Sequence, residues 1–368
     1  MYSPKPLSKI SELHVWPSEF GLPSIETECL QFMVAAKLCA APITFVYDTK
    51  PWKSSSGTFP YFQDESQKIT SFEKFVDYLR TCKQDVVLDN ELVAAQICEF
   101  DVYNCFLKQK LHPAMTQLLW LDHANYSTVT HYWYCSKLPF LYNNWHTERR
   151  RRKAQSFIMT SQKSKDQLTL DAIQVLNTLS AKLADNKYFC GDKPCSLDAL
   201  IFGYLAPLLR LPLPNDRLQL HLSSFDFFMG FAGSEFQCFI NLQVRFVESI
   251  ISIYLPLTES ALQEQTNAKK FWAKRRAEAQ KVLDEGRMRR EQKKAEREGV
   301  QEVFYRDTIL FVAGATVLCI LFALHVGMLE FSSTNLDDDQ FMQSIDLLIG
   351  RNKESRNRAC ELVCADDA

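Results

Sequence analysis

The alternation of apolar and polar positions changes character once along the chain, near Leu88. Before this point, short apolar runs bounded by turn residues predict strands, and apolar positions three or four apart predict helices. The expected order is β-α-β-β-β-α. The predicted strands lie at 13–16, 43–48, 58–62 and 68–69, and the predicted helices at about 24–40 and at 71–80.

This order of elements resembles a thioredoxin-type domain, which we place at residues 10–88. Pro60 stands in the third predicted strand, TFPYF, at the place where that fold carries a cis-proline. Cis peptide bonds are nearly confined to X-Pro pairs. We therefore expect Pro60 to be a structural residue of this type.

Beyond Leu88 only helical spacing remains. Val93, Ile97, Phe100, Tyr103 and Leu107 recur with a period near 3.6, and similar runs follow around 173–183, 200–208 and 238–255. The sequence predicts an all-helical domain over residues 89–258, so that the fold class is α+β and mostly α.

A run of 22 residues, Thr308 to Leu329, contains no Asp, Glu, Lys or Arg, and twelve of its residues are Leu, Ile, Phe or Val. As a helix it would extend ~33 Å, which is enough for the hydrocarbon core of a bilayer. We predict a membrane anchor at 308–329, followed by a polar tail at 330–368.

The segment before the anchor is strongly basic. Lys269 to Arg297 holds twelve Lys or Arg against five Asp or Glu, while the far side of the anchor begins with Glu330 and Asp337 to Asp339. The positive-inside rule then places the body in the cytosol. We predict a solvated helical stalk at 259–307, whose basic residues also attract anionic lipid.

Composition narrows the picture further. The formal net charge of -2 gives no global attraction to nucleic acid, and the N-terminus lacks the pattern of a secretory signal. The 12 cysteines form no C-x-x-C pair, so buried free thiols are expected at positions such as Cys29, Cys39, Cys98 and Cys105. Cys360 and Cys364 could pair if the tail faced an oxidising space.

The segment GDKPCSLDALIFGYLAPLL predicts the start of a buried helix. Asp198 fits the third helical position of a capping box, while the cap position falls on Cys195, a poor capping residue, and Ser196 comes one residue late. This segment resembles the opening of the central helix in the second domain of glutathione transferases. A small α/β domain followed by a helical one is also the architecture of those proteins.

Four longer blocks of the sequence carry a more specific resemblance. The blocks are FGLPSIETECL (20–30), KPWKSSSGTFPYF (50–62), WLDHANYSTVTHYWYCSKLPF (120–140) and YFCGDKPCSLDALIFGYLAPLL (188–209). They resemble the metaxin family. The resemblance implies an outer mitochondrial membrane protein with its body in the cytosol, which pairs with a second metaxin and associates with the β-barrel sorting and assembly machinery. Metaxins have also been linked to motor adaptors.

Transferase chemistry would need a hydroxyl or thiol just after the first strand and an acidic or amide residue before a serine at the third helix. Ser18 and Ser24 lie near the first place, but Ser24 is better explained as a helix N-cap. Thr70-Ser71 at the second place lacks the partner. We therefore expect no catalytic residues, no cofactor, no metal site and no small-molecule substrate.

Protein contacts are the remaining function class. Tyr132, Trp133, Tyr134 and Trp145 are candidate docking residues if exposed, although core packing explains them as well. Arg149, Arg150, Arg151 and Arg152 are expected at an exposed helix edge or loop. A subunit for protein import and β-barrel assembly is the leading interpretation, with a membrane-tethered glutathione-dependent transferase and a mitochondrial transport adaptor as alternatives.

Overall fold

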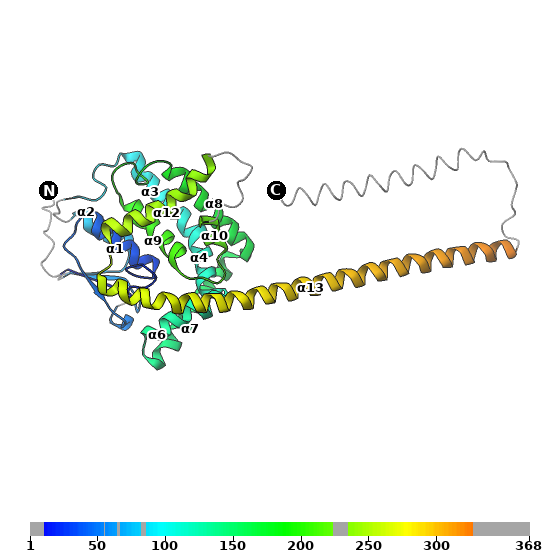
Figure 1. Ribbon diagram of the computed structural model, residues 1–368. Coiled ribbons are helices and arrows are strands. Elements are labelled where there is room, and N and C mark those ends of the chain that lie inside the picture. The colour runs from blue at the N-terminus through cyan, green and yellow to red at the C-terminus, as the bar shows by residue number, and fades with distance from the viewer. Residues whose placement is uncertain (1–10, 55, 65–66, 82–85, 224–234, 327–368) are drawn as a thin grey trace. The chain divides into compact units, whose positions relative to one another are not determined.

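The computed structural model of the protein describes residues 11–54, 56–64, 67–81, 86–223 and 235–326 (Figure 1). The chain divides into two compact units, residues 1–288 and residues 289–368. The predicted tail at 330–368, with Cys360 and Cys364, lies outside the described residues.

The first unit opens with the predicted α/β domain. Its four-stranded sheet has the order β2-β1-β3-β4, with β1 parallel to β2 and antiparallel to β3, and β3 antiparallel to β4. The Phe59–Pro60 bond directly before β3 is cis, as expected for Pro60. The elements are β1 (Glu12–Val15), α1 (Thr27–Leu38), β2 (Thr44–Tyr47), the short 3-10 helix η1 (Pro51–Lys53), β3 (Tyr61–Gln63), β4 (Lys68–Ile69) and α2 (Phe72–Thr81).

The start of α1 differs from the prediction. Ser24 is not its N-cap, because the helix begins at Thr27 and the cap position is held by Glu26 in extended conformation. Glu19 and Leu22 close a tight turn by mutual backbone hydrogen bonds just upstream, and Ser24 is completely buried between this turn and the helix. The residues after the turn are extended, so the helix begins at Thr27, three residues after the predicted start at about residue 24.

The rest of the first unit is helical as predicted. Three π-helical segments interrupt the region between residues 107 and 130, where sequence periodicity alone predicts ordinary α-helix. The elements are α3 (Ala94–Phe106), η2 (Leu107–Leu111), α4 (His112–Thr116), η3 (Gln117–Leu121), α5 (His123–Asn125), η4 (Tyr126–Thr130), α6 (His131–Lys137), α7 (Phe140–Ser161), α8 (Lys165–Leu183), α9 (Ser196–Arg210), α10 (Arg217–Ser223) and α12 (Glu235–Tyr254).

Helix α9 is the centre of this unit, and α1 packs directly along it (Figure 1). A Cβ atom at Gly203 would lie 2.6 Å from the carbonyl oxygen of Thr27, so the two backbones approach more closely than any side chain permits. The amide of Gln31 donates a hydrogen bond to the Leu200 carbonyl oxygen across the same joint, at 3.1 Å. The α/β domain and the helical domain therefore share one continuous core.

Helix α13 (Glu259–His325) contains the predicted stalk, and its first part is docked rather than solvated. Trp272 is buried and packs edge-on against Phe20, with ring centroids 4.9 Å apart. Arg276 donates to Asp216 at 2.7 Å, and the Arg275 guanidinium lies 4.1 Å from the centroid of the Tyr132 ring. The prediction of a free stalk from residue 259 is wrong for this part, because Trp272 supplies an apolar anchor in an otherwise charged sequence.

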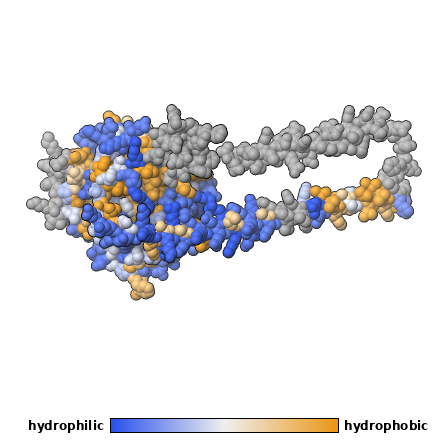
Figure 2. Space-filling model, in the orientation of Figure 1, coloured by the Kyte–Doolittle hydropathy of each residue, from blue (hydrophilic) through white to orange (hydrophobic). Residues whose placement is uncertain are grey.

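Within the described residues one helix is long and apolar enough to cross a membrane, over Tyr305–Ala323. This window has a mean hydropathy of 1.8 and no share of it is buried. Figure 2 shows hydrophobic side chains along this part of α13 and hydrophilic ones along the preceding part. So large an exposed apolar surface is typical of a membrane or protein contact.

The cysteines follow the prediction only in part. Cys29 and Cys39 are buried as predicted, whereas Cys98 and Cys105 are exposed on α3. These two were expected to be buried because their neighbours are apolar. Helix α3 instead turns that face outward, and Val93, Ile97 and Val102 are exposed with them.

Candidate functional site

A cleft of about 730 Å³ lies where the α/β domain meets the helical domain. Its walls come from the start of α1, the loop before β3, the π-helical segments and one face of α7. The lining residues are mostly aromatic or basic. Those used below are Glu26, Glu28, Trp52, Thr58, Phe59, Trp120, Trp133, Tyr134, Tyr142, Trp145, His146, Arg149, Arg150 and Lys153.

An ion pair joins the two walls of the cleft. Arg150 on α7 pairs with Glu26 at the N-cap of α1, and the Tyr134 hydroxyl donates to the same carboxylate. Arg150 also donates to the Tyr134 oxygen at 3.1 Å. Burial acts to lower the pKa of Arg150, but the Glu26 carboxylate raises it overall, so the guanidinium stays charged. This triad clamps the two domains together at the back of the cleft.

Helix α7 presents further cations to the cleft. Arg149 and Lys153 lie one turn apart on the same face, and both are exposed. The Arg149 guanidinium stacks on the Trp145 ring at 5.1 Å. In the part of the chain that the structure describes, neither cation forms an ion pair with a carboxylate. Glu28 also lines the cleft, so the positive charge is not left wholly uncompensated.

Aromatic rings run continuously from the core to the mouth of the cleft. Tyr134 packs edge-on against Trp133 at 5.0 Å, and His146 lies 6.0 Å from Tyr134 and 5.5 Å from Tyr142. Tyr142 in turn contacts Trp52 and Trp145, both about half exposed. Ring-lined surfaces of this kind bind apolar groups with defined geometry.

Two buried nitrogens in this chain of rings have no hydrogen-bond partner in the described structure, Trp133 Nε1 and His146 Nε2. Burial, together with the positive charges of Arg150 and Arg149, lowers the pKa of His146 to about 4. His146 is therefore neutral at physiological pH. Buried polar groups are normally satisfied, and exceptions mark strain or a binding function.

The four predicted docking aromatics lie in three different environments. Trp133 and Tyr134 are buried at 0% and 2% exposure, so the prediction that they are exposed contact residues is wrong and their alternative, core packing, is correct. Tyr132 contacts Phe271 and Trp272 of α13. Of the four, Trp145 alone remains at the mouth of the cleft.

The run of arginines lies within α7 rather than in a loop, and its four members point in different directions. Arg149 and Arg150 face the cleft. Arg151 stacks over the Tyr126 ring at 4.6 Å, and Arg152 pairs with the exposed Glu148 one turn away. The prediction of an exposed edge fails for Arg150, because a four-residue run on a helix must place at least one member inward.

Several residues of the site escaped the sequence analysis. Glu26, Trp52 and Tyr142 lie in different elements, and nothing in the sequence signals that they converge. Phe140 and Leu141 are more than 80% exposed where α6 ends and α7 begins, and we call this place the α6–α7 tip. The position of these two residues beside Pro139 predicts a helix start but not their exposure.

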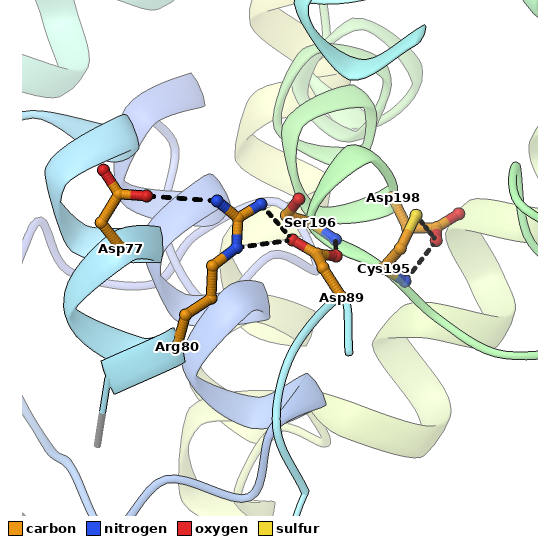
Figure 3. A network of polar contacts seen from close by, with 6 residues as sticks. All are labelled: Asp77, Arg80, Asp89, Cys195, Ser196 and Asp198. Atoms are coloured by element: carbon orange, nitrogen blue, oxygen red, sulfur yellow. Dashed lines mark hydrogen bonds and ion pairs between the residues drawn. The ribbon is translucent and has the colours of Figure 1, made fainter. Parts of the chain in front are cut away.

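The start of α9 forms a second polar network, shown in Figure 3. Asp198 accepts hydrogen bonds from the backbone N–H groups of Phe189 and Cys195, both at 2.8 Å, and from the Cys195 thiol at 3.1 Å. Burial raises the pKa of Asp198 to about 6, although these hydrogen bonds act to lower it. Asp198 thus reaches back to the cap residue as predicted, whereas the Cys195 side chain donates to it rather than capping the helix.

The cap that Cys195 does not supply comes from elsewhere in the chain. Asp89 accepts a hydrogen bond from the Ser196 backbone N–H at 2.7 Å, and its other oxygen pairs with Arg80 of α2 at 2.6 Å (Figure 3). Asp89 adopts a positive φ of 63°, which aspartate tolerates better than most residues. One carboxylate from the interdomain connection therefore ties α2 to α9.

The residues considered for transferase chemistry do not line the cleft. Ser71 donates to Glu73 at 2.7 Å, and Ser24 is completely buried. Ser18 is half-buried. The cleft hydroxyls come instead from other positions, such as Thr58.

Comparison with known proteins agrees with this architecture. Residues 29–152 match a family model described as "Outer mitochondrial membrane transport complex protein" (Tom37), and residues 172–232 match "Glutathione S-transferase, C-terminal domain". A "Metaxin-1 homolog" of Caenorhabditis briggsae is 44% identical over 324 residues, which cover 87% of this chain and 97% of the relative. The chain belongs to the metaxin family.

One further relative and one solved structure are also similar to this chain. "Metaxin-3" of Danio rerio is 33% identical over 224 residues, covering 58% of this chain and 71% of that protein. A glutathione S-transferase of Ceriporiopsis subvermispora, solved in complex with glutathione, has 13% identity and a TM-score of 0.47, covering 68% of this chain and 99% of that one. The metaxin-family chain has the glutathione-transferase-like fold that the order of its elements predicts.

Proposed function

We propose that this protein is a non-catalytic subunit of the protein import and β-barrel assembly machinery of the outer mitochondrial membrane. The observation that carries the proposal is an unburied apolar helix on the same chain as a folded two-domain body. The family model that the chain matches describes a transport complex protein of the outer mitochondrial membrane. The body would face the cytosol, since the basic part of α13 precedes the apolar part.

The proposed division of labour follows the chain. Residues 10–88 and 89–258 form the body, residues 259–307 connect it, residues 308–329 anchor it and residues 330–368 form the tail. The docked contact of Trp272 restricts the freely solvated part of the connection to residues after Arg276. The basic residues from Lys281 to Arg297 are exposed and could meet anionic lipid, at roughly 1 kcal/mol for each one near the surface.

The contact surface for a partner is proposed at the tip where α6 meets α7. Phe140 and Leu141 expose more than 80% of their area there, an unusual exposure for adjacent large apolar residues. The partner implied by the family is a second metaxin-type protein. Burying both side chains in its surface would provide the apolar centre that a stable interface needs.

Mitochondria depleted of the protein and complemented with variants test this proposal. The double variant Phe140→Ser/Leu141→Ser should lose co-purification with a second metaxin and slow the assembly of an imported β-barrel precursor, while import of matrix precursors continues. Met159→Ser, at the other end of α7 and 71% exposed, is the matched control. Normal β-barrel assembly in depleted mitochondria would contradict the proposal.

The two alternative functions give different results in the same cells. A transport adaptor would leave β-barrel assembly intact and change the distribution of mitochondria along microtubules. A glutathione-dependent transferase would be recognised outside the cell instead, because the purified protein would conjugate glutathione to an electrophile. The position of Ser18, Ser24 and Ser71 away from the cleft favours the non-catalytic proposal over the transferase.

A further inference from the structure

We propose that the interdomain cleft is a binding site for a small organic anion, with a carboxylate or phosphate group on an apolar, preferably aromatic, body. The inference goes beyond the proposed function, which uses the α6–α7 tip and not the cleft. It concerns binding only and involves no reaction.

Arg149 and Lys153 indicate that the ligand carries an anionic group. Both side chains line the cleft, both are accessible, and neither has a carboxylate partner among the described residues. Arg150, beside them, is already neutralised by Glu26. Stacking on Trp145 holds the Arg149 guanidinium in place, which reduces the entropy lost on binding an anion. One charge of Glu28 limits the site to a ligand with few negative charges.

The aromatic walls of the cleft indicate that the rest of the ligand is apolar. Trp52, Tyr142 and Trp145 form a ring cluster, with centroid separations of 4.9 and 5.3 Å, and Trp120 and Phe59 also line the cleft. The cleft volume of about 730 Å³ falls in the range of sites for small organic molecules, roughly 300–1,000 Å³. An inorganic ion would leave nearly all of this apolar surface unused.

The inner end of the cleft has spare hydrogen-bonding capacity. Trp133 is fully buried and His146 is 3% exposed; both line the cleft, and the Trp133 Nε1 and His146 Nε2 nitrogens have no partner in the described residues. Both nitrogens are themselves buried, so a ligand in the cleft would reach them only if the surrounding side chains moved.

Isothermal titration calorimetry on the full chain in nanodiscs of zwitterionic lipid tests the site. The probe is 2-naphthoate, and its matched controls are neutral 2-naphthalenemethanol and cationic 2-naphthylmethylammonium. We expect 2-naphthoate to bind at least tenfold more tightly than either control. The double variant Arg149→Gln/Lys153→Gln should lower the affinity for 2-naphthoate at least tenfold. Its affinity for the neutral probe should stay within twofold of the parent chain's.

Arg152→Gln is the control variant, because it removes a cation from the same helix outside the cleft lining; it should leave all affinities within twofold. Tryptophan emission and helical content check that each variant is folded, and Lys153→Gln alone is the second variant should the double one misfold. Competition by octanoate separates the ligand sources: strong competition points to an acyl-chain ligand, weak competition to a soluble aromatic one.

The proposal is overturned by absence of 2-naphthoate binding at millimolar concentration. Equal affinity for the anionic and neutral probes, or equal loss in the Arg152→Gln and cleft variants, would also overturn it. These results bear on the cleft alone, because the β-barrel assembly test depends on Phe140 and Leu141.

Discussion

The two polar networks of the body differ in how completely their groups are satisfied. At the start of α9, Asp198 and Asp89 between them accept hydrogen bonds from three backbone N–H groups, one thiol and one guanidinium. In the cleft, Arg150 and Glu26 are paired, yet Arg149 and Lys153 beside them have no carboxylate partner in the described chain. Both networks join the α/β domain to the helical domain.

The difference separates folding from binding. A buried group whose hydrogen bonds are all made contributes to a unique structure and offers nothing to a ligand. Charged and hydrogen-bonding groups with unused capacity, placed around an apolar space, are typical of binding sites. We therefore assign the network at α9 and the paired Arg150 and Glu26 to stability, and Arg149 and Lys153 to recognition. Four substitutions or pH changes test the contrast.

Asp198→Ala should have the largest effect. It leaves the buried N–H groups of Phe189 and Cys195 without acceptors, at about 1–3 kcal/mol each, so we expect the free energy of unfolding to fall by ~3 kcal/mol or more. Urea unfolding of the full chain, followed by tryptophan emission, measures it. Asp192→Ala, six residues upstream and exposed, should change the free energy by less than ~0.5 kcal/mol. A similar loss for both variants would remove the contrast.

Arg150→Met should have the second largest effect. It leaves the Glu26 carboxylate, 11% exposed, facing the Tyr134 hydroxyl without its cation. Removing one partner from a buried ion pair typically lowers the free energy of unfolding by several kcal/mol. Because the Arg150 side chain is 27% exposed, we expect a smaller decrease of about 2 kcal/mol. The double variant Glu26→Gln/Arg150→Met should recover part of it. Arg152→Met, whose partner is exposed, should lose no more than ~0.5 kcal/mol.

The pH dependence of stability sharpens the contrast on the cleft side. His146 has its pKa lowered from 6.5 to about 4, so between these values the unfolded chain binds more protons than the folded one. Stability therefore falls as the pH falls, by roughly 1–2 kcal/mol between pH 7 and pH 5. Urea midpoints at the two pH values measure this, and His146→Phe should make the curve flatter. Identical curves for the variant and the parent chain would show that His146 does not titrate in this way.

The sequence predicts the fold well because the fold depends on periodic signals. The strand runs, the cis-Pro60 position and the apolar helix near residue 308 are each local patterns that survive in the structure. The start of α1 was predicted wrongly because a tight turn at Glu19 and Leu22 competes with helix formation, and the serine at position 24 is a capping residue only in isolation.

The cleft was predictable only in part because its residues converge from distant elements. The arginine run and Trp145 were recognised as candidates, but their directions depend on which face of α7 meets α1. Arg150 faces the cleft because it pairs with Glu26. These two residues are 124 positions apart, so no local sequence pattern connects them. Trp133 and Tyr134 were uncertain for the same reason, since a pair of aromatics is compatible with either a core or a surface.

The smallest effect is expected from Cys195→Ser at the cap of α9. The serine hydroxyl can donate to Asp198 as the thiol does, and it is also the better capping residue that the sequence pattern anticipates. Asp89 already supplies an acceptor at the Ser196 N–H, however, so little remains for the new hydroxyl to satisfy. We expect a change within ~0.5 kcal/mol in urea unfolding, whereas Cys195→Ser combined with Asp89→Ala should be milder than Asp89→Ala alone. If serine stabilised the single variant by ~1 kcal/mol or more, the α9 network would have the unused capacity that we assign to the cleft alone.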